Sequence, residues 1–176
     1  MRKLLIEEMN RLSVEEFKES DKFPFVIVLD NIRSLNNVGS FFRTADAFRA
    51  RKLILCGYTQ NPPHREITRS ALGAENSVIW EKEETTLAAV IKLKEEGYRI
   101  ISVEQAEGST LLQNFEPESN VPYAFVFGNE VEGVADEVIA ASDKCVEIPQ
   151  FGTKHSFNVS VSAGIVLWEF VRKNLT

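Results

Sequence analysis

Residues 158–169, NVSVSAGIVLWE, combine small polar side chains with an apolar stretch of helical length. Polar or small residues cluster where this helix would begin, namely Ser156, Asn158, Ser160, Ser162 and Gly164. The other residues form a face suited to burial against protein, namely Val159, Ile165, Val166, Leu167, Trp168 and Phe170. Free backbone N–H groups at a helix start, with Asn or Ser beside them, can hold a ligand or another loop. We therefore expect this helix start to be a binding position.

Short apolar, β-branched runs alternate with helix-length segments along the rest of the chain. The runs are FVIVLD (25–30), KLILCGY (52–58), SVIWEK (77–82), YRIISVE (98–104), AFVFG (124–128) and CVEIP (145–149). Helices are expected at 2–19, where Ser13 and Glu16 form a capping box that can break the helix, and at 37–49, 64–71, 84–96, 134–141 and 157–173. This alternation predicts an α/β fold, a parallel sheet flanked by helices on both faces, with residues 107–122 as a surface connection.

The composition is that of an ordinary soluble protein. The chain has 176 residues, of which 44% are hydrophobic and 26% are charged, enough for one domain with a sizeable core. No apolar run approaches the roughly 20 residues of a membrane span, and Glu7 and Glu8 interrupt the N-terminus where a signal peptide would stay apolar. We expect a cytoplasmic protein that makes no membrane contact. Cys56 and Cys145 lie in apolar runs, which favours free buried thiols over a disulfide or a metal pair.

The net charge of −6 argues against a protein that coats nucleic acid through a basic surface. Any contact with RNA must therefore be local. Basic residues gather in two places, which are Arg43, Arg49, Arg51 and Lys52, and then His64, Arg65 and Arg69. Scattered solvated charges are the plainer interpretation of both clusters.

The segment DNIRSLNNVGSFFRTADAF, residues 30–48, carries polar groups at the start of a helix. An apolar stripe contains Val38, Phe41, Phe42, Ala45 and Phe48. Arg43 points away from this stripe, and we expect the small residues Gly39 and Ser40 to let an anion approach its guanidinium. Two plainer alternatives stay open, because Arg43 could pair with Asp46 and Asn37 could simply cap the helix.

A third polar segment is FVFGNEVEG, residues 125–133, a glycine-bracketed acidic loop that ends an apolar strand. Ligands of α/β sheets bind at the carboxyl ends of strands, and Glu130 could accept hydrogen bonds from a ligand or from a neighbouring loop. An exposed turn is the alternative, and Glu132 is expected to face solvent. No GxGxxG or GK[ST] signature is present, which disfavours nicotinamide and ATP chemistry. The chain's two histidines, His64 and His155, lack partners at ligand spacing, so no metal site is expected.

Together the three segments closely resemble the three motifs of the SpoU family of RNA ribose 2'-O-methyltransferases, part of the SPOUT superfamily. NxGxxxR matches residues 37–43, GxExxG matches residues 128–133, and IPxxGxxxSxNVSVxxG matches residues 148–164. The order is that of the family, and the resemblance covers about residues 23–173. It implies an N-terminal helical extension at 1–22 and a methyltransferase domain at 23–176.

The resemblance also implies a fold, a cofactor and a site. The C-terminal segment would form a deep trefoil knot, a rare exception to unknotted folding. S-adenosylmethionine would lie against the loops at Gly128, Ile148 and Phe157, with the strand end near Val103 as a weaker candidate. The matching catalytic positions are Arg43, Asn37, Glu130, Ser156 and Asn158. The enzyme would be a homodimer in which Arg43 of one subunit reaches the methyl donor of the other.

The resemblance implies that the protein methylates a ribose 2'-hydroxyl of structured RNA. With no added RNA-binding domain before the first strand, tRNA and rRNA are both open, and tRNA is favoured. Residues 64–76, HREITRSALGAEN, could face RNA or could form an ordinary helix with exposed arginines. Two rivals remain: a non-catalytic RNA-binding or assembly factor that keeps the fold, and a methyltransferase that acts on bases. The matches at Arg43, Glu130 and Asn158 speak against the first, and the segment 37–43 disfavours the second.

Overall fold

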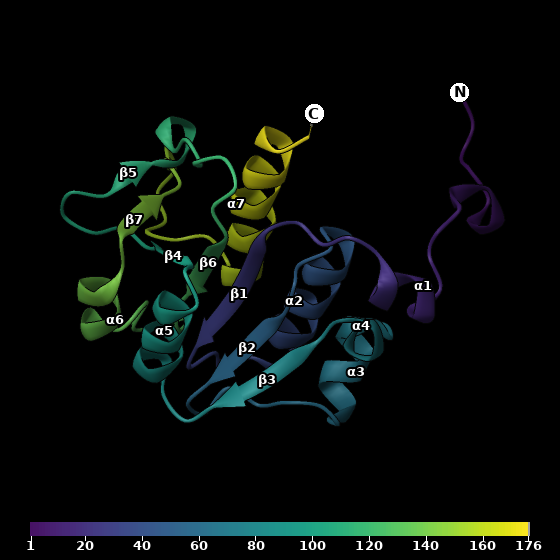
Figure 1. The fold of residues 1–176 in the computed structure, drawn as a ribbon, viewed down its shortest axis with the longest axis horizontal. Coiled ribbons are helices and arrows are strands. Elements are labelled where there is room, and N and C mark those ends of the chain that lie inside the picture. Colours follow the sequence, from purple (N-terminus) through teal and green to yellow (C-terminus); the bar gives the residue numbers. More distant parts are fainter. Residues whose placement is uncertain (176) are drawn as a thin grey trace.

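A computed structural model describes residues 1–175, apart from the side chain of Ile6. Its centre is a seven-stranded sheet in which every strand pair is parallel (Figure 1). In spatial order the strands are β3 (Trp80–Glu83), β2 (Leu53–Cys56), β1 (Phe25–Asp30), β6 (Tyr123–Phe127), β4 (Arg99–Val103), β7 (Lys144–Glu147) and β5 (Thr110–Leu111). The α/β fold expected from the sequence is confirmed.

Helices cover both faces of this sheet (Figure 1). They are α1 (Val14–Glu19), α2 (Leu35–Ala47), α3 (Arg65–Ala71), α4 (Ala74–Ser77), α5 (Thr86–Glu95), α6 (Asp136–Ala141) and α7 (Val159–Lys173), with 3-10 turns at Ile6–Met9 and Leu112–Asn114. Alternate residues of β1 point to opposite faces. Phe25, Ile27 and Leu29 join the core beneath α2, α3 and α7, whereas Val26 and Val28 join the core beneath α5 and α6.

Helix α7 is held to the sheet by an aromatic cluster. The Phe170 ring lies 5.2 Å from that of Phe125, 5.4 Å from Tyr123 and 5.6 Å from Phe25, all edge to face. Complete burial of such a ring contributes about 3 kcal/mol. The apolar face expected from the sequence is therefore largely buried, except that Trp168 is 49% exposed.

Several boundaries differ from the sequence prediction for physical reasons. The expected helix at 2–19 is wrong for its first part, because only α1 (Val14–Glu19) is α-helical and residues 6–9 form a 3-10 turn. The expected capping box is present, since the Ser13 Oγ accepts from the Glu16 N–H at the start of α1. Strand β3 is polar because it forms one edge of the sheet, so the expectation of apolar strands covered on both faces is wrong for it. The stretch 107–122 contains the short strand β5, which pairs with β7. The proposed division at residue 22 stays a prediction.

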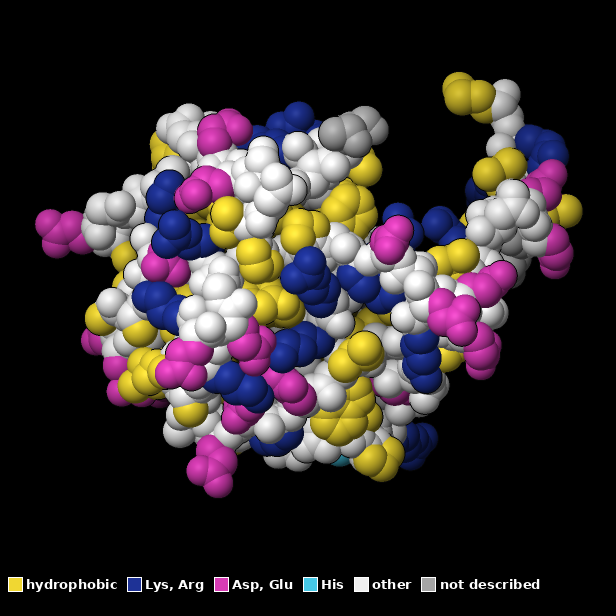
Figure 2. All heavy atoms as spheres, viewed as in Figure 1, with side chains coloured by type: hydrophobic (Ala, Val, Ile, Leu, Met, Phe, Trp, Pro, Cys, Tyr) yellow, Lys and Arg dark blue, Asp and Glu magenta, His cyan; other side chains and the backbone are white. Residues whose placement is uncertain are grey.

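Surface charges of both signs are interspersed on the face that Figure 2 shows, and the N-terminal extension projects from the body. Within residues 1–175, no helix is long and apolar enough to cross a membrane.

Candidate functional site

The carboxyl ends of β1, β6, β4 and β7 meet at one edge of the sheet. Register places Leu29 beside Phe127, Phe127 beside Val103, and Val103 beside Val146. The polar segments that follow these strands are therefore brought together, although bonded residues within them lie up to 121 positions apart in the chain.

The loop after β6, residues 128–134, is folded tightly on itself, and we call it the 128–134 wall. The N–H and C=O groups of Asn129 and Gly133 pair with each other at 2.9 Å. The Asn129 Oδ1 accepts from the N–H groups of Val131 (2.8 Å) and Glu132 (3.0 Å). A Cβ at Gly128 would lie 2.1 Å from backbone atoms of Gly133 and Val134, so only glycine fits there.

Glu130 anchors this wall to the start of α2. Its carboxylate accepts from the backbone N–H groups of Arg33 (2.9 Å) and Ser34 (3.0 Å) and from Nδ2 of Asn37 (2.8 Å). Partial burial opposes ionisation of this carboxyl, yet the three donors outweigh that effect and hold the pKa of Glu130 below its ordinary value. Of the alternatives left open by the sequence, the neighbouring loop is the partner. Glu132 is exposed, as expected.

Asn37 connects all three sequence motifs. It is not the helix cap, because the Oγ of Ser34 takes that role by accepting from the Asn37 N–H. The Asn37 side chain instead donates to Glu130, and its Oδ1 accepts from Nδ2 of Asn158 at 3.1 Å. Asn158 in turn caps α7, since its Oδ1 accepts from the N–H groups of Ser160 and Val161. Glu130, Asn37 and Asn158 thus form one hydrogen-bonded chain.

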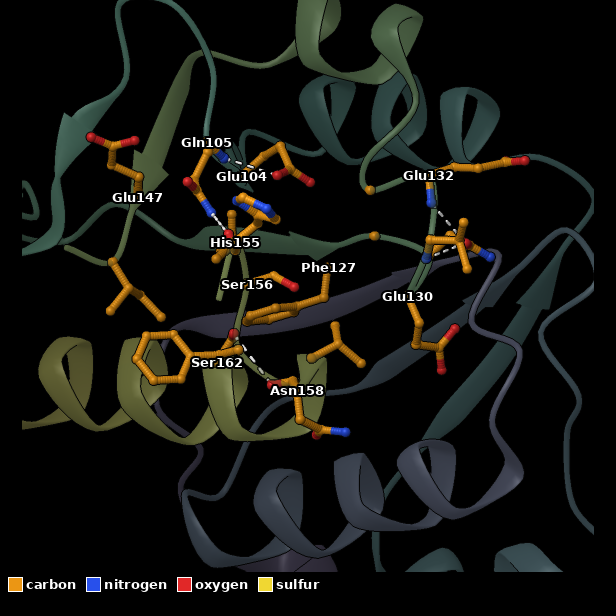
Figure 3. A pocket seen from close by; sticks show the side chains of 18 of the residues that line it. Glu104, Gln105, Phe127, Glu130, Glu132, Glu147, His155, Ser156, Asn158 and Ser162 are labelled. Carbon is orange, nitrogen blue, oxygen red and sulfur yellow. Dashed lines mark hydrogen bonds between the residues drawn. The ribbon is translucent and has the colours of Figure 1, made fainter. Parts of the chain in front are cut away.

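A cavity of about 560 Å³ lies beside this chain (Figure 3). Its other side is the segment between β7 and α7, residues 149–157, which we call the 149–157 wall. The cavity lining contains every cofactor position expected from the sequence, namely Gly128, Ile148, Phe157 and the weaker candidate Val103. It also includes three of the expected catalytic residues, which are Glu130, Ser156 and Asn158. Ser156 and Phe157 are exposed to solvent.

The cavity lining combines acidic and apolar side chains. Four carboxylates line it, those of Glu104, Glu130, Glu132 and Glu147, and no lysine or arginine does so among the described residues. Phe127, Val146 and Ile148 supply apolar surface. Such a lining suits a cationic ligand with an aromatic part. Within residues 1–175, no group of three or more His, Cys, Asp or Glu side chains is arranged to hold a metal ion.

Arg43 lies on the exposed side of α2 and is not among the residues that line the cavity of its own chain. The alternative of an ion pair with Asp46 is absent from the described residues, and Asp46 accepts instead from the Ser77 hydroxyl at 2.6 Å. The expectation that Gly39 leaves room for an anion is wrong. A Cβ at Gly39 would meet the Ser70 Oγ at 2.0 Å, so Gly39 permits close packing of α2 on α3.

Cys56 is a buried free thiol, as expected, whereas Cys145 is a free thiol that is only half-buried. Burial raises the pKa of the Cys56 thiol to about 12 and also raises that of Cys145. Burial therefore disfavours the thiolate form of both cysteines. His64 has a structural role, because its Nδ1 accepts from the Glu66 N–H at the start of α3.

Sequence reasoning missed three residues of the site. Glu104 and Gln105 follow β4 and line the cavity, and Asn129 organises the 128–134 wall. Glu104 and Gln105 match none of the motifs, so only their place after a strand could have indicated them.

Comparison with known proteins agrees with this geometry. Residues 24–168 match the model of the SpoU rRNA Methylase family. The mouse tRNA (guanosine(18)-2'-O)-methyltransferase TARBP1 is 33% identical over 153 residues, which are 85% of this chain and 9% of the mouse protein. The 23S rRNA (guanosine-2'-O-)-methyltransferase RlmB of Neisseria meningitidis is 32% identical over 167 residues, 94% of this chain and 66% of that protein.

Solved structures show the same fold. The AdoMet-bound rRNA methyltransferase from Sinorhizobium meliloti superposes with a TM-score of 0.81 at 26% identity, over 91% of this chain and 60% of that chain. The A. aeolicus TrmH/SpoU tRNA modifying enzyme superposes with a TM-score of 0.80 at 24% identity, over 97% and 85% of the two chains. The chain therefore belongs to the SpoU methylase family, which includes 2'-O-methyltransferases of tRNA and of rRNA.

Proposed function

We propose that this protein transfers a methyl group from S-adenosylmethionine to a ribose 2'-hydroxyl of structured RNA. The observation that carries the proposal is the hydrogen-bonded chain Glu130, Asn37 and Asn158, which joins the three family motifs beside one cavity. A non-catalytic RNA-binding factor would have no need of this arrangement next to an acidic cavity. The family membership supports the same reaction.

The cavity residues fit the proposed methyl donor. S-adenosylmethionine supplies an electrophilic methyl group on a positively charged sulfonium. The four glutamates of the lining would favour that positive charge, and Ile148 and Phe157 offer apolar walls for an adenine ring. A solved structural neighbour is an AdoMet-bound enzyme, which supports the assignment.

Arg43 would act on the acceptor RNA from a second subunit. Its guanidinium keeps its proton in proteins, so it is suited to bind an adjacent phosphate and to polarise the hydroxyl rather than to act as a base. The hydroxyl proton would leave to phosphate or water. Positioning of the hydroxyl oxygen in line with the methyl group supplies much of the barrier reduction.

We propose a homodimer packed through α7. Trp168 and Val161 on this helix are 49% and 50% exposed, and the Trp168 ring lies 6.3 Å from that of Phe48 beside α2. A second copy would cover this apolar surface. It would also bring the exposed Arg43 of one subunit within reach of its partner's cavity.

We propose that the C-terminal segment forms a trefoil knot. Strand β7 lies between β4 and β5, and the connection from β4 to β6 contacts the C-terminal segment at two distant points. Gln105 donates to the His155 carbonyl, and Lys173 donates to the Phe115 carbonyl. An experimental electron-density map with an unthreaded backbone would contradict the knot.

Methyl transfer is tested with labelled S-adenosylmethionine and unmodified bulk tRNA or rRNA, followed by nucleoside analysis. We expect label on a ribose 2'-oxygen. Relatives are named methyltransferases of tRNA and of rRNA, so both RNAs are assayed, and we expect tRNA to be the better substrate. Label on a base would indicate the base-directed rival. RNA binding without transfer would indicate the non-catalytic rival.

The role of Arg43 is tested by Arg43→Ala. We expect transfer to fall by about 10³-fold, the order of effect of removing one group that stabilises transition-state charge. Affinity for S-adenosylmethionine, measured by calorimetry, should be unchanged, because Arg43 is proposed to bind the acceptor RNA rather than the methyl donor. Normal turnover by the variant would contradict the proposed role.

A further inference from the structure

Two adjacent residues after β4, Glu104 and Gln105, form hydrogen bonds with opposite walls of the cavity. Figure 3 shows the bond from Gln105 to His155. Neither belongs to the three family motifs. Strand β4 lies inside the sheet between β6 and β7, so its carboxyl end is a rigid position from which to hold both walls.

Glu104 fixes the 128–134 wall. Its Oε2 accepts from the backbone N–H of Val134 at 3.1 Å, and its Oε1 accepts from the N–H of Gln105 at 2.9 Å. Gly133 has φ +74°, and a Cβ there would lie 2.4 Å from the same Oε2. The carboxylate therefore sits directly against the end of this wall.

Gln105 fixes the 149–157 wall. Its side-chain Nε2 donates to the backbone carbonyl of His155 at 2.6 Å. Among the hydrogen bonds of residues 1–175, this is the only one made by residues 149–157. Residues 151–157 are all exposed to solvent, and Phe151 is 95% exposed. One amide thus holds the middle of a wall that is otherwise attached only at its ends.

We propose that Glu104 and Gln105 are positioning residues that set the distance between the two walls, with Gln105 acting as the latch of the 149–157 wall. The consequence for the methyl donor rests on the proposed function. When Gln105 is bonded to His155, the cavity keeps Ile148, Ser156 and Phe157 in place for the donor. When the bond is broken, the wall moves away and donor affinity falls.

The latch is tested without any ligand by tryptic cleavage after Lys154, which lies in the middle of the 149–157 wall. Gln105→Met keeps the side-chain length and the net charge but removes the amide donor. We expect cleavage after Lys154 to become about 3- to 10-fold faster, as loss of one hydrogen bond predicts. Cleavage after Arg11, in the N-terminal extension, should keep its rate.

A second pair of measurements distinguishes a change confined to one wall from a general loss of stability. Glu104→Met, which removes the carboxylate oxygen that accepts from the Val134 N–H, should speed hydrogen exchange of the Val134 amide and should leave cleavage after Lys154 unchanged. Gln105→Met should do the reverse. The matched control is Gln113→Met, an exposed glutamine whose side chain makes no hydrogen bond within the described chain; it should change neither measurement.

Donor binding completes the test. Gln105→Met should raise the KM and the Kd for S-adenosylmethionine by about 3- to 10-fold and leave kcat at saturating donor unchanged. Wild-type rates of cleavage and wild-type donor affinity in this variant would overturn the proposal. If the wild-type protein binds no donor, the proposed function fails, and the proteolysis and exchange measurements still decide the roles of Glu104 and Gln105.

Discussion

The two walls of the cavity are built in opposite ways. The 128–134 wall pairs its own backbone, receives the Glu104 carboxylate and is tied to α2 through Glu130. The 149–157 wall makes one hydrogen bond within the described chain and is largely exposed. The chain therefore assembles the first wall by itself. The second wall leaves most of its polar groups without a hydrogen-bond partner within the described chain, so they are available to the proposed donor and RNA.

A pair of glycine substitutions gives the largest expected contrast between the walls. In Gly128→Ala the new Cβ would lie 2.1 Å from backbone atoms of Gly133 and Val134, which cannot move without opening the 128–134 wall. We expect a loss of about 3 kcal/mol in the free energy of unfolding. For a chain of this size that loss lowers Tm by roughly 10 °C, measured by calorimetry.

Gly152→Ala is the matched substitution in the 149–157 wall. A Cβ at Gly152 meets nothing within 4 Å, so the free energy of unfolding should change by less than about 0.5 kcal/mol. Equal losses of unfolding free energy in Gly128→Ala and Gly152→Ala would contradict the account of a packed 128–134 wall and an open 149–157 wall.

Within the 128–134 wall, the Glu130 side chain is hydrogen-bonded to the start of α2, whereas the Glu132 side chain is exposed. Glu130→Ala removes the acceptor of three hydrogen bonds that join this wall to α2. We expect a loss of about 1–2 kcal/mol, because solvent can replace part of the lost bonding. Glu132→Ala, which alters an exposed side chain, should stay within about 0.5 kcal/mol. Urea unfolding of both variants decides whether the bonding of Glu130, rather than its charge alone, stabilises the wall.

The smallest expected effect is a dependence on pH. The pKa of Glu130 is lowered in the folded protein, so its ionised form is the stabilising one. That contribution is present above the unfolded pKa of about 4.3 and is lost as the pH falls through the lowered folded value. In urea unfolding, the stability difference between wild type and Glu130→Gln should hold from pH 7 to about 5 and shrink below about 4. A difference that grows on acidification would contradict this sign.

Much of the fold could be predicted from local patterns. The run FVIVLD coincides with β1, and the capping box at Ser13 marks the start of α1. Both features depend only on residues that are close together in the chain, so the sequence alone is enough to predict them. The polar edge strand β3 and the short strand β5 depend on their places in the sheet, and no local pattern gives those places.

Site residues could be predicted where a family motif specifies their residue type. They could not be predicted where their role depends on tertiary contacts. Asn37, Glu130 and Asn158 were identified by motif, although the bonds between them join residues 93 and 121 positions apart. Gly39 was misread because its contact with α3 is tertiary. Gln105 was missed because its one side-chain hydrogen bond spans 50 positions.

Mixed dimers test the composite active site most directly. One subunit carries Arg43→Ala, and the other carries Ile148→Trp, which fills the cavity. Each variant alone should transfer methyl groups only at background rate. Heterodimers purified through two different tags should regain roughly half of the wild-type rate, because one of their two equivalent sites combines an intact cavity with an intact Arg43. Heterodimers that stay at background, or normal transfer by the Arg43→Ala protein alone, would contradict an active site shared between subunits.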